Sequence, residues 1–427
     1  MQRLFILILM GGTLAANAQK YVCGQADPGS EIGAIPLTAS SLYTATFPGF
    51  DLNTAPEVNA GFCSSDKPFF FSAALPEGSY RVTVTLCSSH PSATTIRAEA
   101  RRLMVEQAVT TFSASAIRIF DVNLRVPQIA GDTGHTVKLK PREVGNLDWD
   151  NKLTLEFNGD RPSIHSLSIE PIKETTIYLA GDSTVVDQDV EPWAAWGQML
   201  TRFLNPGVVV ANHAESGETI RSFVSEQRLS KILSLIQPGD YLFIQFGHND
   251  QKPNAVPIDE YKTLLIDYIA KTRAKGATPV LVTSMNRRTF DSEGKITNSL
   301  SPYTEAVREV AGSQHAALID LNAMSKTLFE AMGPDVSMNA FMHYPANAYP
   351  NQTEAISDDT HFNSYGAYEL ARCVVRGIRD AKLPLIEFVN ENVAAFDPSI
   401  PDPQPYFHLP ATPIPPKTAN VMKVPQI

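Results

Sequence analysis

The chain has 427 residues, of which 43% are hydrophobic and 19% are charged. This composition is typical of a globular protein with a sizeable core and excludes a largely disordered chain, while the length indicates two or three domains. The formal net charge of −10 argues against a protein that binds nucleic acid or an anionic membrane through its overall charge. Local basic residues can still bind an anionic substrate inside a cleft.

Residues 1–18 have the pattern of a signal peptide. A positive charge at Arg3 precedes a mostly apolar run at 4–14, and residues 16–18 form an A-x-A cleavage site, so we expect the mature chain to begin at Gln19. The alternative is a membrane anchor, but the apolar run is too short to cross about 30 Å of hydrocarbon, and no later stretch is long enough. We therefore expect a secreted or periplasmic protein without membrane insertion.

Residues 19–172 are rich in short strand patterns. Segment 80–86 alternates polar and apolar residues, and segment 153–157 is followed by the turn dipeptide Asn158-Gly159. Turn residues separate such runs at short intervals and no long helical period is present, so this region is predicted to form an all-β sandwich. The phenylalanine run at 69–71 is expected in its core, the alternative being an exposed patch that stacks on sugars.

The chain has four cysteines, Cys23, Cys63, Cys87 and Cys373. Their spacing does not resemble a zinc site. Three of them lie in the N-terminal third, where an exported protein can form one disulfide, and the sequence leaves the pairing open.

Residues 173–390 have a different pattern, in which apolar strands alternate with amphipathic helices. Strands are predicted at 176–180, 208–211, 241–246, 279–283 and 317–321, and helices at 193–204, 222–236, 259–275, 303–311 and 364–380. Repeated alternation of this kind predicts an α/β domain with a doubly wound parallel sheet and helices on both faces. Ligands bind beyond the carboxyl ends of the strands in such sheets.

The C-terminal segment, 391–427, is rich in proline, with nine prolines between Pro398 and Pro425. Proline at this density opposes helices and central strands. The segment is either a linker or a strap that lies over the folded body, and the sequence leaves these alternatives open.

A serine nucleophile with its base is the main chemical signal. Ser183 follows a predicted strand, and a serine hydroxyl needs a base that is itself oriented by a third group. Asp358 precedes His361 by three residues, so its carboxylate can turn back onto Nδ1 and leave Nε2 free to take the Ser183 proton. By itself, a Gly-Asp-Ser tripeptide is more often a turn than an active site. A D-x-x-H motif before a helix is more often a helix cap, and here Asp359 could cap the helix that begins near Ser364. The chain has no G-x-S-x-G elbow.

Two further segments end predicted strands with groups that can bind an oxyanion. Gly217 allows close approach of a backbone N–H to a substrate, and Asn249 offers side-chain N–H donors. With the Ser183 amide they form a candidate oxyanion hole, in which the loss of one donor raises the barrier by about 3 kcal/mol.

These segments together resemble the blocks of the SGNH, or GDSL-type, hydrolase superfamily over about residues 175–381. The resemblance implies a flavodoxin-like fold, with Ser183 as nucleophile, Asp358 and His361 completing the triad, and Ser183, Gly217 and Asn249 forming the oxyanion hole. One departure is Gly-Asp-Ser-Thr in place of Gly-Asp-Ser-Leu, which leaves the nucleophile intact.

Finer detail is similar to the rhamnogalacturonan acetylesterases of carbohydrate esterase family twelve. The shared features are segment 181–184, Gly197 after Trp196, and segments 216–217 with 221–223, 247–250 and 358–363. This resemblance implies acyl transfer from an acetylated pectic polysaccharide or oligosaccharide, with no metal or organic cofactor. The N-terminal sandwich is similar to galactose-binding-like accessory domains.

Other residues are candidates for substrate contacts. Arg221 suits a uronate carboxylate as a planar bidentate donor or is a structural ion-pair partner. His248 either shapes the acyl pocket or packs the loop, and His343 lies on a predicted loop that either touches substrate or is surface. Trp193 and Trp196 are expected to pack on the sheet, the alternative being a sugar platform.

The sequence therefore predicts a secreted serine esterase that deacetylates pectic polysaccharide. Two alternatives stay open. One is an SGNH esterase or lipase for other small acyl esters or acetylated xylan, since a fold supports many specificities. The other is a non-catalytic carbohydrate-binding protein in which the sandwich is the working part.

Overall fold

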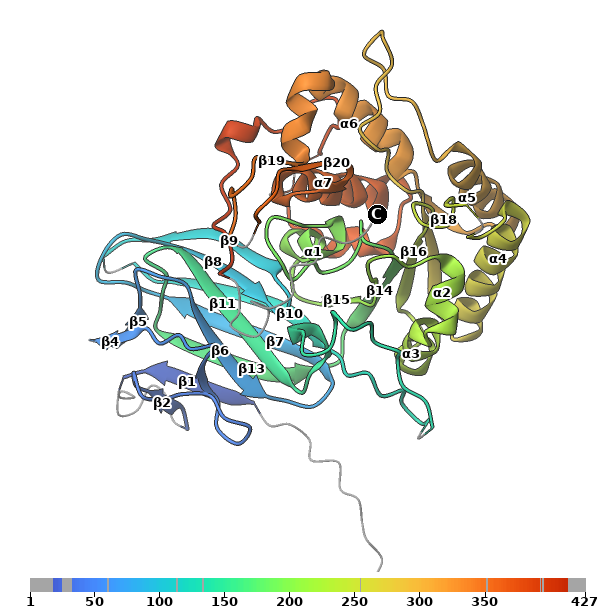
Figure 1. Ribbon diagram of the computed structural model, residues 1–427. Coiled ribbons are helices and arrows are strands. Elements are labelled where there is room, and N and C mark those ends of the chain that lie inside the picture. The colour runs from blue at the N-terminus through green and yellow to red at the C-terminus, as the bar shows by residue number, and fades with distance from the viewer. Residues whose placement is uncertain are drawn as a thin grey trace, which may run out of the picture.

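A β-rich domain and an α/β domain lie side by side (Figure 1) in the computed structural model. The structure describes residues 18–24, 33–59, 61–112, 114–132, 134–253, 255–350, 352–391, 393 and 395–413. The predicted signal peptide, apart from residue 18, and the chain beyond residue 413 lie outside these ranges. No helix among the described residues is long and apolar enough to cross a membrane.

The first domain is a β-sandwich, as the sequence predicts. In the described part of the chain, one five-stranded sheet has the order β10-β7-β13-β1-β2, a second has the order β3-β6-β11-β8-β9, and β12-β5-β4 form a small third sheet. The strands are β1 (Gln19–Cys23), β2 (Ile35–Leu37), β3 (Gly49–Asp51), β4 (Glu57–Asn59), β5 (Phe62–Ser64), β6 (Phe69–Ala74), β7 (Gly78–Leu86), β8 (Ser92–Ala98), β9 (Arg102–Thr110), β10 (Ala116–Leu124), β11 (Lys152–Asp160), β12 (Ser163–Ile164) and β13 (Ser166–Ile172). A short 3₁₀ helix, η1 (Leu147–Trp149), lies in the long connection between β10 and β11.

Alternating side chains build the core of this sandwich. In β7, Val82, Val84 and Leu86 are buried and the residues between them are partly exposed, as the period of a strand requires. They pack against the inner face of the second sheet, which includes Phe71 and Phe157. The phenylalanine run in β6 is therefore core, and the alternative of an exposed stacking patch is wrong.

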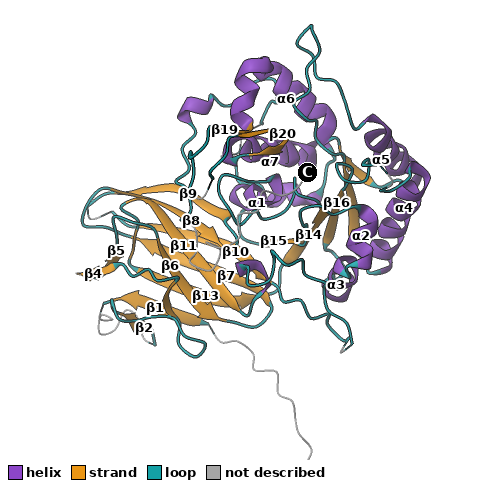
Figure 2. Cartoon of the chain, in the orientation of Figure 1, coloured by secondary structure: helices purple, strands orange, loops and turns teal. Residues whose placement is uncertain are grey.

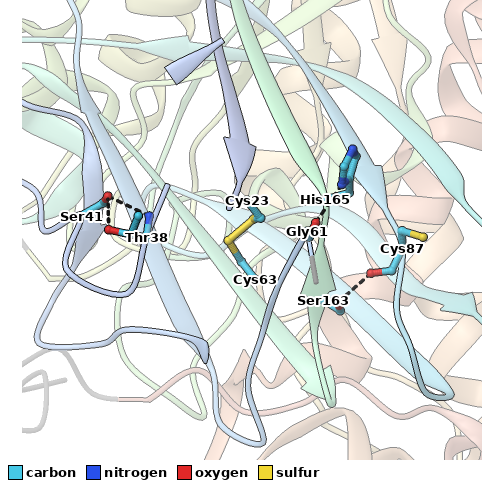
Figure 3. Close-up of a disulfide and its surroundings, with 8 residues drawn as sticks. All are labelled: Cys23, Thr38, Ser41, Gly61, Cys63, Cys87, Ser163 and His165. Atoms are coloured by element: carbon cyan, nitrogen blue, oxygen red, sulfur yellow. Dashed lines mark hydrogen bonds between the residues drawn. A yellow bond between two sulfur atoms is a disulfide. The ribbon is translucent and has the colours of Figure 1, made fainter. Parts of the chain in front are cut away.

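A disulfide joins Cys23 at the end of β1 to Cys63 in β5, with the two Cα atoms 5.5 Å apart (Figure 3). The other two cysteines are free, Cys87 being partly exposed and Cys373 buried. This settles the pairing that the sequence leaves open.

The second domain contains a parallel sheet covered by helices on both faces, as Figure 2 shows. Among the described residues, the sheet has five strands in the order β15-β14-β16-β17-β18, which is the flavodoxin-like order. The strands are β14 (Thr175–Gly181), β15 (Val208–Asn212), β16 (Tyr241–Gln245), β17 (Thr278–Val282) and β18 (Ala317–Ile319), with a separate antiparallel pair of β19 (Phe341–Tyr344) and β20 (Ile356–Phe362).

The helices cover the two faces in separate groups. They are α1 (Trp196–Leu200), α2 (Ile220–Ser225), α3 (Arg228–Leu235), α4 (Ile258–Ala274), α5 (Ser301–Gln314), α6 (Leu321–Val336) and α7 (Ser364–Asp380), with 3₁₀ segments η2 (Thr201–Phe203), η3 (Ser337–Ala340), η4 (Pro384–Phe388) and η5 (Gln404–Tyr406). In β14, Ile177 and Leu179 face the core shared with α1, α6 and α7, whereas Tyr178 and Ala180 face α2 to α5. Both faces are apolar because both are covered.

Four local expectations need correction. The helix predicted at 222–236 is divided into α2 and α3, because Gln227 adopts a left-handed φ of 66° that no helix accommodates. Helix α6 was not predicted, and the loop predicted at His343 is the strand β19, which pairs with β20. The predicted cap Asp359 is also wrong, since the Asn363 side chain accepts the Gly366 N–H at 3.1 Å and caps α7.

The proline-rich segment, as far as residue 413, is a strap rather than a free linker. The carbonyls of Pro410 and Ala411 accept hydrogen bonds from Arg97 (2.6 Å) and Asn158 (2.9 Å) of the sandwich. Thr412 donates its N–H to Glu191 of the α/β domain at 3.1 Å. In Figure 1 this red segment lies beside β8, and it ties the two domains together.

Candidate active site

The site lies where the parallel strands end. β14 ends at Gly181, and the loop after β15 is fixed to it because the Glu215 N–H donates to the Gly181 carbonyl at 3.2 Å. The loop after β16 joins them, since Asn249 Nδ2 donates to the Glu218 carbonyl at 2.9 Å. The carboxyl ends of neighbouring parallel strands thus bring the Ser183, Gly217 and Asn249 segments to one edge of the sheet.

Ser183, His361 and Asp358 form a continuous hydrogen-bonded chain. Ser183 Oγ lies 2.9 Å from His361 Nε2, and His361 Nδ1 lies 2.7 Å from Asp358 Oδ2. The three-residue spacing lets the Asp358 carboxylate turn back onto the His361 ring, as the sequence indicates. The other Asp358 oxygen accepts the His361 backbone N–H at 3.0 Å and fixes this turn. Ser183 is 7% exposed and the His361 side chain 20%, so both face a surface that a substrate can reach.

The protonation states follow from the surroundings of Asp358. Burial raises the pKa of this carboxyl, but the hydrogen bond and charge of His361 and the backbone N–H groups of Thr360 and His361 outweigh it and hold the pKa at about 2. Asp358 is therefore ionised at neutral pH. Nδ1 of His361 donates to it, and Nε2 is left as the acceptor for the Ser183 hydroxyl, which is the arrangement a general base requires.

Gly217 and Asn249 lie on the two loops that border Ser183. The backbone turns at 215–218, with the Glu218 N–H donating to the Glu215 carbonyl at 3.2 Å and with a Gly217 φ of +80°. A positive φ at the third residue is that of a type II turn, which favours glycine. None of the backbone hydrogen bonds among the described residues uses the Gly217 N–H, so this donor is available to a ligand.

Buried polar groups support the nucleophile loop. Asp182 accepts the Thr184 N–H and hydroxyl at 2.9 and 2.7 Å, and His248 Nδ1 lies 3.5 Å from its other oxygen. Burial raises the pKa of Asp182, but the neighbouring His248 and the Thr184 donors outweigh burial and lower it. His248 is buried and packs against this loop, which matches the packing alternative for that residue.

The other predicted contact residues have protein partners. Arg221 in α2 forms an exposed ion pair with Glu260, with Nε 2.6 Å from the carboxylate, as its structural alternative expects. His343 lies on β19, not on a loop, and its Nε2 is 2.8 Å from Asp359, next to the Asp358 of the triad. His343 also lines a cavity of about 540 Å³ bordered by the sandwich, the strap and the α/β domain.

The two tryptophans have different roles. Trp196 is fully buried and donates its Nε1–H to Gln245 at 2.9 Å, which confirms packing for that residue. Trp193 is partly exposed and lies edge-on to the His361 ring, with ring centroids 5.4 Å apart. Its carbonyl accepts a hydrogen bond from Arg101 of the sandwich at 2.8 Å.

Sequence reasoning missed the contribution of the sandwich domain. Arg101, Lys140 and Arg142 all reach loops that border Ser183. The only sequence signal is a basic run at 138–142, which alone reads as a solvated surface. In the part of the chain that the structure describes, no group of three or more His, Cys, Asp or Glu side chains is arranged to hold a metal ion.

Comparisons with known proteins find esterases among the relatives of this chain. The GDSL-like Lipase/Acylhydrolase family model matches residues 179–367. Rhamnogalacturonan acetylesterase RhgT of Bacillus subtilis (strain 168) is 44% identical over 216 residues, which cover 50% of this chain and 93% of that protein. The uncharacterized esterase YxiM of the same organism is 29% identical over 406 residues, which cover 89% of this chain and 97% of the YxiM chain. A crystal structure of Bacillus subtilis YxiM is 25% identical and superposes with a TM-score of 0.47, covering 86% of this chain and 99% of the YxiM chain. The chain is a carboxylic ester hydrolase and belongs to the GDSL-like lipase/acylhydrolase family.

Proposed function

We propose that this protein is an exported acetylesterase that removes acetyl groups from pectic polysaccharide of the rhamnogalacturonan type. The observation that carries the reaction is the Ser183–His361–Asp358 hydrogen-bonded chain at the end of β14. The substrate class is supported by relatives such as RhgT, a rhamnogalacturonan acetylesterase that matches this chain over 93% of its own length. Export is supported by the signal-peptide pattern of residues 1–18.

The reaction proceeds in two acyl transfers. His361 Nε2 takes the Ser183 proton while Oγ attacks the acetyl carbonyl carbon, and the N–H groups of Ser183, Gly217 and the Asn249 side chain bind the oxyanion. His361 then protonates the departing sugar oxygen, which leaves an acetyl-Ser183 enzyme. Water that loses its proton to His361 attacks this ester, and collapse of the second tetrahedral intermediate releases acetate and restores the Ser183 hydroxyl.

Arg221 and His343 are proposed as substrate contacts with different requirements. Arg221 can bind a uronate carboxylate only when it leaves Glu260, and solvent screening keeps this exposed ion pair weak. In the Arg221→Ala variant, KM should rise far more for a uronate-containing substrate than for a neutral aryl acetate. Equal effects on both substrates would make Arg221 structural only. His343 lines the cavity between the sandwich, the strap and the α/β domain, and its Nε2 contacts Asp359, the chain neighbour of the triad Asp358. This cavity is the candidate place for sugar units that extend away from the ester.

The decisive experiment measures acetate released from a panel of acetylated polysaccharides. Acetylated rhamnogalacturonan should be the preferred substrate over acetylated xylan, and aryl esters with long acyl chains should react slowly. Comparable rates on long chains would contradict the acetyl specificity. Ser183→Ala should abolish release, whereas the control Ser225→Ala, on the exposed side of α2, should leave it unchanged. A protein that binds these polysaccharides without releasing acetate would instead be a carbohydrate-binding module.

A further inference from the structure

The sandwich domain reaches the peptide that supplies one oxyanion donor. Lys140 Nζ donates to the Ser216 carbonyl at 2.7 Å, and Arg142 Nη2 donates to the same oxygen. Both residues lie in the connection between β10 and β11 of the sandwich. A Cβ built on Gly217 would be 3.8 Å from Lys140 Nζ and 3.9 Å from Arg142 Nη2, so both cations also border Gly217 itself.

This connection is anchored firmly enough to hold a fixed position. The Lys140 N–H donates to Glu143 at 2.8 Å, and Glu143 pairs with the fully buried Arg228 of α3 through two hydrogen bonds of 3.0 and 2.5 Å. A backbone bond from Lys138 N–H to the Glu226 carbonyl, at 2.9 Å, docks the same connection onto the α/β domain. The connection that carries the two cations is thus anchored by the buried Glu143–Arg228 pair.

Carboxylates on either side of Gly217 fix each cation. Arg142 Nε donates to Glu215 at 2.6 Å, and Lys140 pairs with the fully buried carboxylate of Glu218. Each cation therefore contacts both a carboxylate and the Ser216 carbonyl. The two cations of the sandwich domain thus contact the turn at 215–218 at its two ends and at its central peptide. The α/β domain holds the same turn through the Gly181 carbonyl and the Asn249 side chain.

The held carbonyl and the Gly217 N–H belong to one planar trans peptide, so they point in opposite directions. Type I and type II turns differ by turning this central peptide over, and glycine at the third position permits both. In the type II form seen here the Ser216 oxygen meets Lys140 and Arg142. A flip would remove that oxygen from both donors and redirect the Gly217 N–H.

We propose that Lys140 and Arg142 are positioning residues for the oxyanion hole, which hold the Ser216–Gly217 peptide so that its N–H faces the developing oxyanion. Two cationic donors on the carbonyl also polarise the amide, which makes its N–H a stronger donor. This inference rests on the proposed acyl-transfer function. It makes the sandwich domain part of the catalytic apparatus rather than a separate module.

The test uses the full chain with the variants Lys140→Met, Arg142→Met and the double variant. With an aryl acetate, the double variant should lose about 30-fold in kcat with KM changed less than about twofold, because loss of a whole oxyanion donor lowers kcat about 10²–10³-fold and the donor here is misdirected rather than deleted. The conservative variants Lys140→Arg and Arg142→Lys should restore most of the rate. The control is Arg161→Met, which breaks the exposed Arg161–Asp66 pair elsewhere in the sandwich and should have no effect.

A second readout separates positioning from a general loss of structure. An alkyl boronic acid forms a tetrahedral anion on Ser183 and so mimics the oxyanion. Its affinity for the double variant should fall by the same factor as kcat/KM, when both are normalised to the concentration of active enzyme. An unchanged kcat/KM and boronate affinity in the double variant, with an active wild type, would overturn the proposal and leave the esterase function intact. Absence of hydrolysis in the wild type would instead refute the function itself. If the double variant does not fold, the single variant Arg142→Met is used to test the proposal. The Arg142 side chain is 47% exposed, so its replacement should leave the fold intact.

Discussion

Arg102 provides the sharpest test of how the two domains depend on each other. It begins β9, is 1% exposed, and donates to Asp187 at 2.8 Å, to Asp148 at 3.0 Å and to the Asn123 carbonyl at 2.7 Å. Asp187 lies in the loop that follows Ser183, whereas Asp148 belongs to the sandwich. The perturbation is Arg102→Met, which keeps the length of the side chain and removes its charge and donors.

The expected loss of stability follows from the two carboxylates, Asp148 and Asp187, that remain buried in the variant. Without Arg102, the carboxylates of Asp148 and Asp187 retain only Arg125 as cation, at 3.2 and 3.8 Å. Removing one partner of a buried charge network costs about 3–5 kcal/mol, so we expect the free energy of unfolding to fall by about 4 kcal/mol at pH 8. Burial and the nearby Asp148 raise the pKa of Asp187 to about 6 in the intact protein. The loss should therefore be smaller at pH 5, where Asp187 is protonated.

The assay is urea unfolding followed by far-ultraviolet circular dichroism at pH 8 and pH 5. Adding Asp187→Asn to Arg102→Met should recover part of the loss, because it removes the uncompensated charge. Arg161→Met is the matched control, since an exposed pair contributes only about 0–1 kcal/mol. A loss in Arg102→Met no larger than in this control would refute the reasoning that the buried charges couple the domains.

Three further predictions concern stability. Replacing Cys23 and Cys63 by alanine removes a cross-link between residues 40 apart, so the free energy of unfolding in urea should fall by about 4 kcal/mol, and a change below 1 kcal/mol would contradict this. Burial raises the pKa of Asp250 to about 7, so the folded state holds a proton that the unfolded state loses above about pH 4, and stability should fall by about 4 kcal/mol as pH rises to 7. Asp250→Asn should flatten this part of the profile of melting temperature against pH, and an unchanged slope would count against it. In Gly366→Ala the new Cβ would lie 2.0 Å from a backbone carbonyl oxygen, which should lower the melting temperature by the equivalent of about 1–3 kcal/mol, whereas Gly312→Ala, with nothing within 4 Å, should raise it slightly.

Much of the architecture could be predicted because its signals are local. The strand β7 shows alternation, the helices α4 and α7 show an apolar face, and the parallel strands are apolar runs between them. The flavodoxin-like strand order was implied by the family resemblance, and the pairing of Ser183 with His361 and Asp358 by the needs of a serine nucleophile. The rule that ligands bind at the carboxyl ends of such strands predicted that the loops after them share one edge of the sheet.

What could not be predicted depends on contacts between distant segments or on unusual backbone. The break between α2 and α3 occurs at Gln227, a residue with no sequence preference for left-handed φ. Helix α6 runs through Gly333-Pro334, a pair that normally ends a helix, and Gly333 indeed has a non-helical φ of 76°. The hydrogen bonds from Lys140 and Arg142 to the Ser216 carbonyl join residues more than seventy positions apart, so no local sequence pattern predicts them.

The most direct test of the central claim is a rapid-quench experiment that locates the acyl group on the enzyme. The full chain is mixed with an aryl acetate, quenched in acid before the second transfer is complete, digested and analysed by mass spectrometry. The account predicts one acetyl group, on Ser183, which disappears on longer incubation and never forms in Ser183→Ala. An acetyl group on another residue, or full hydrolytic activity in Ser183→Ala, would contradict it.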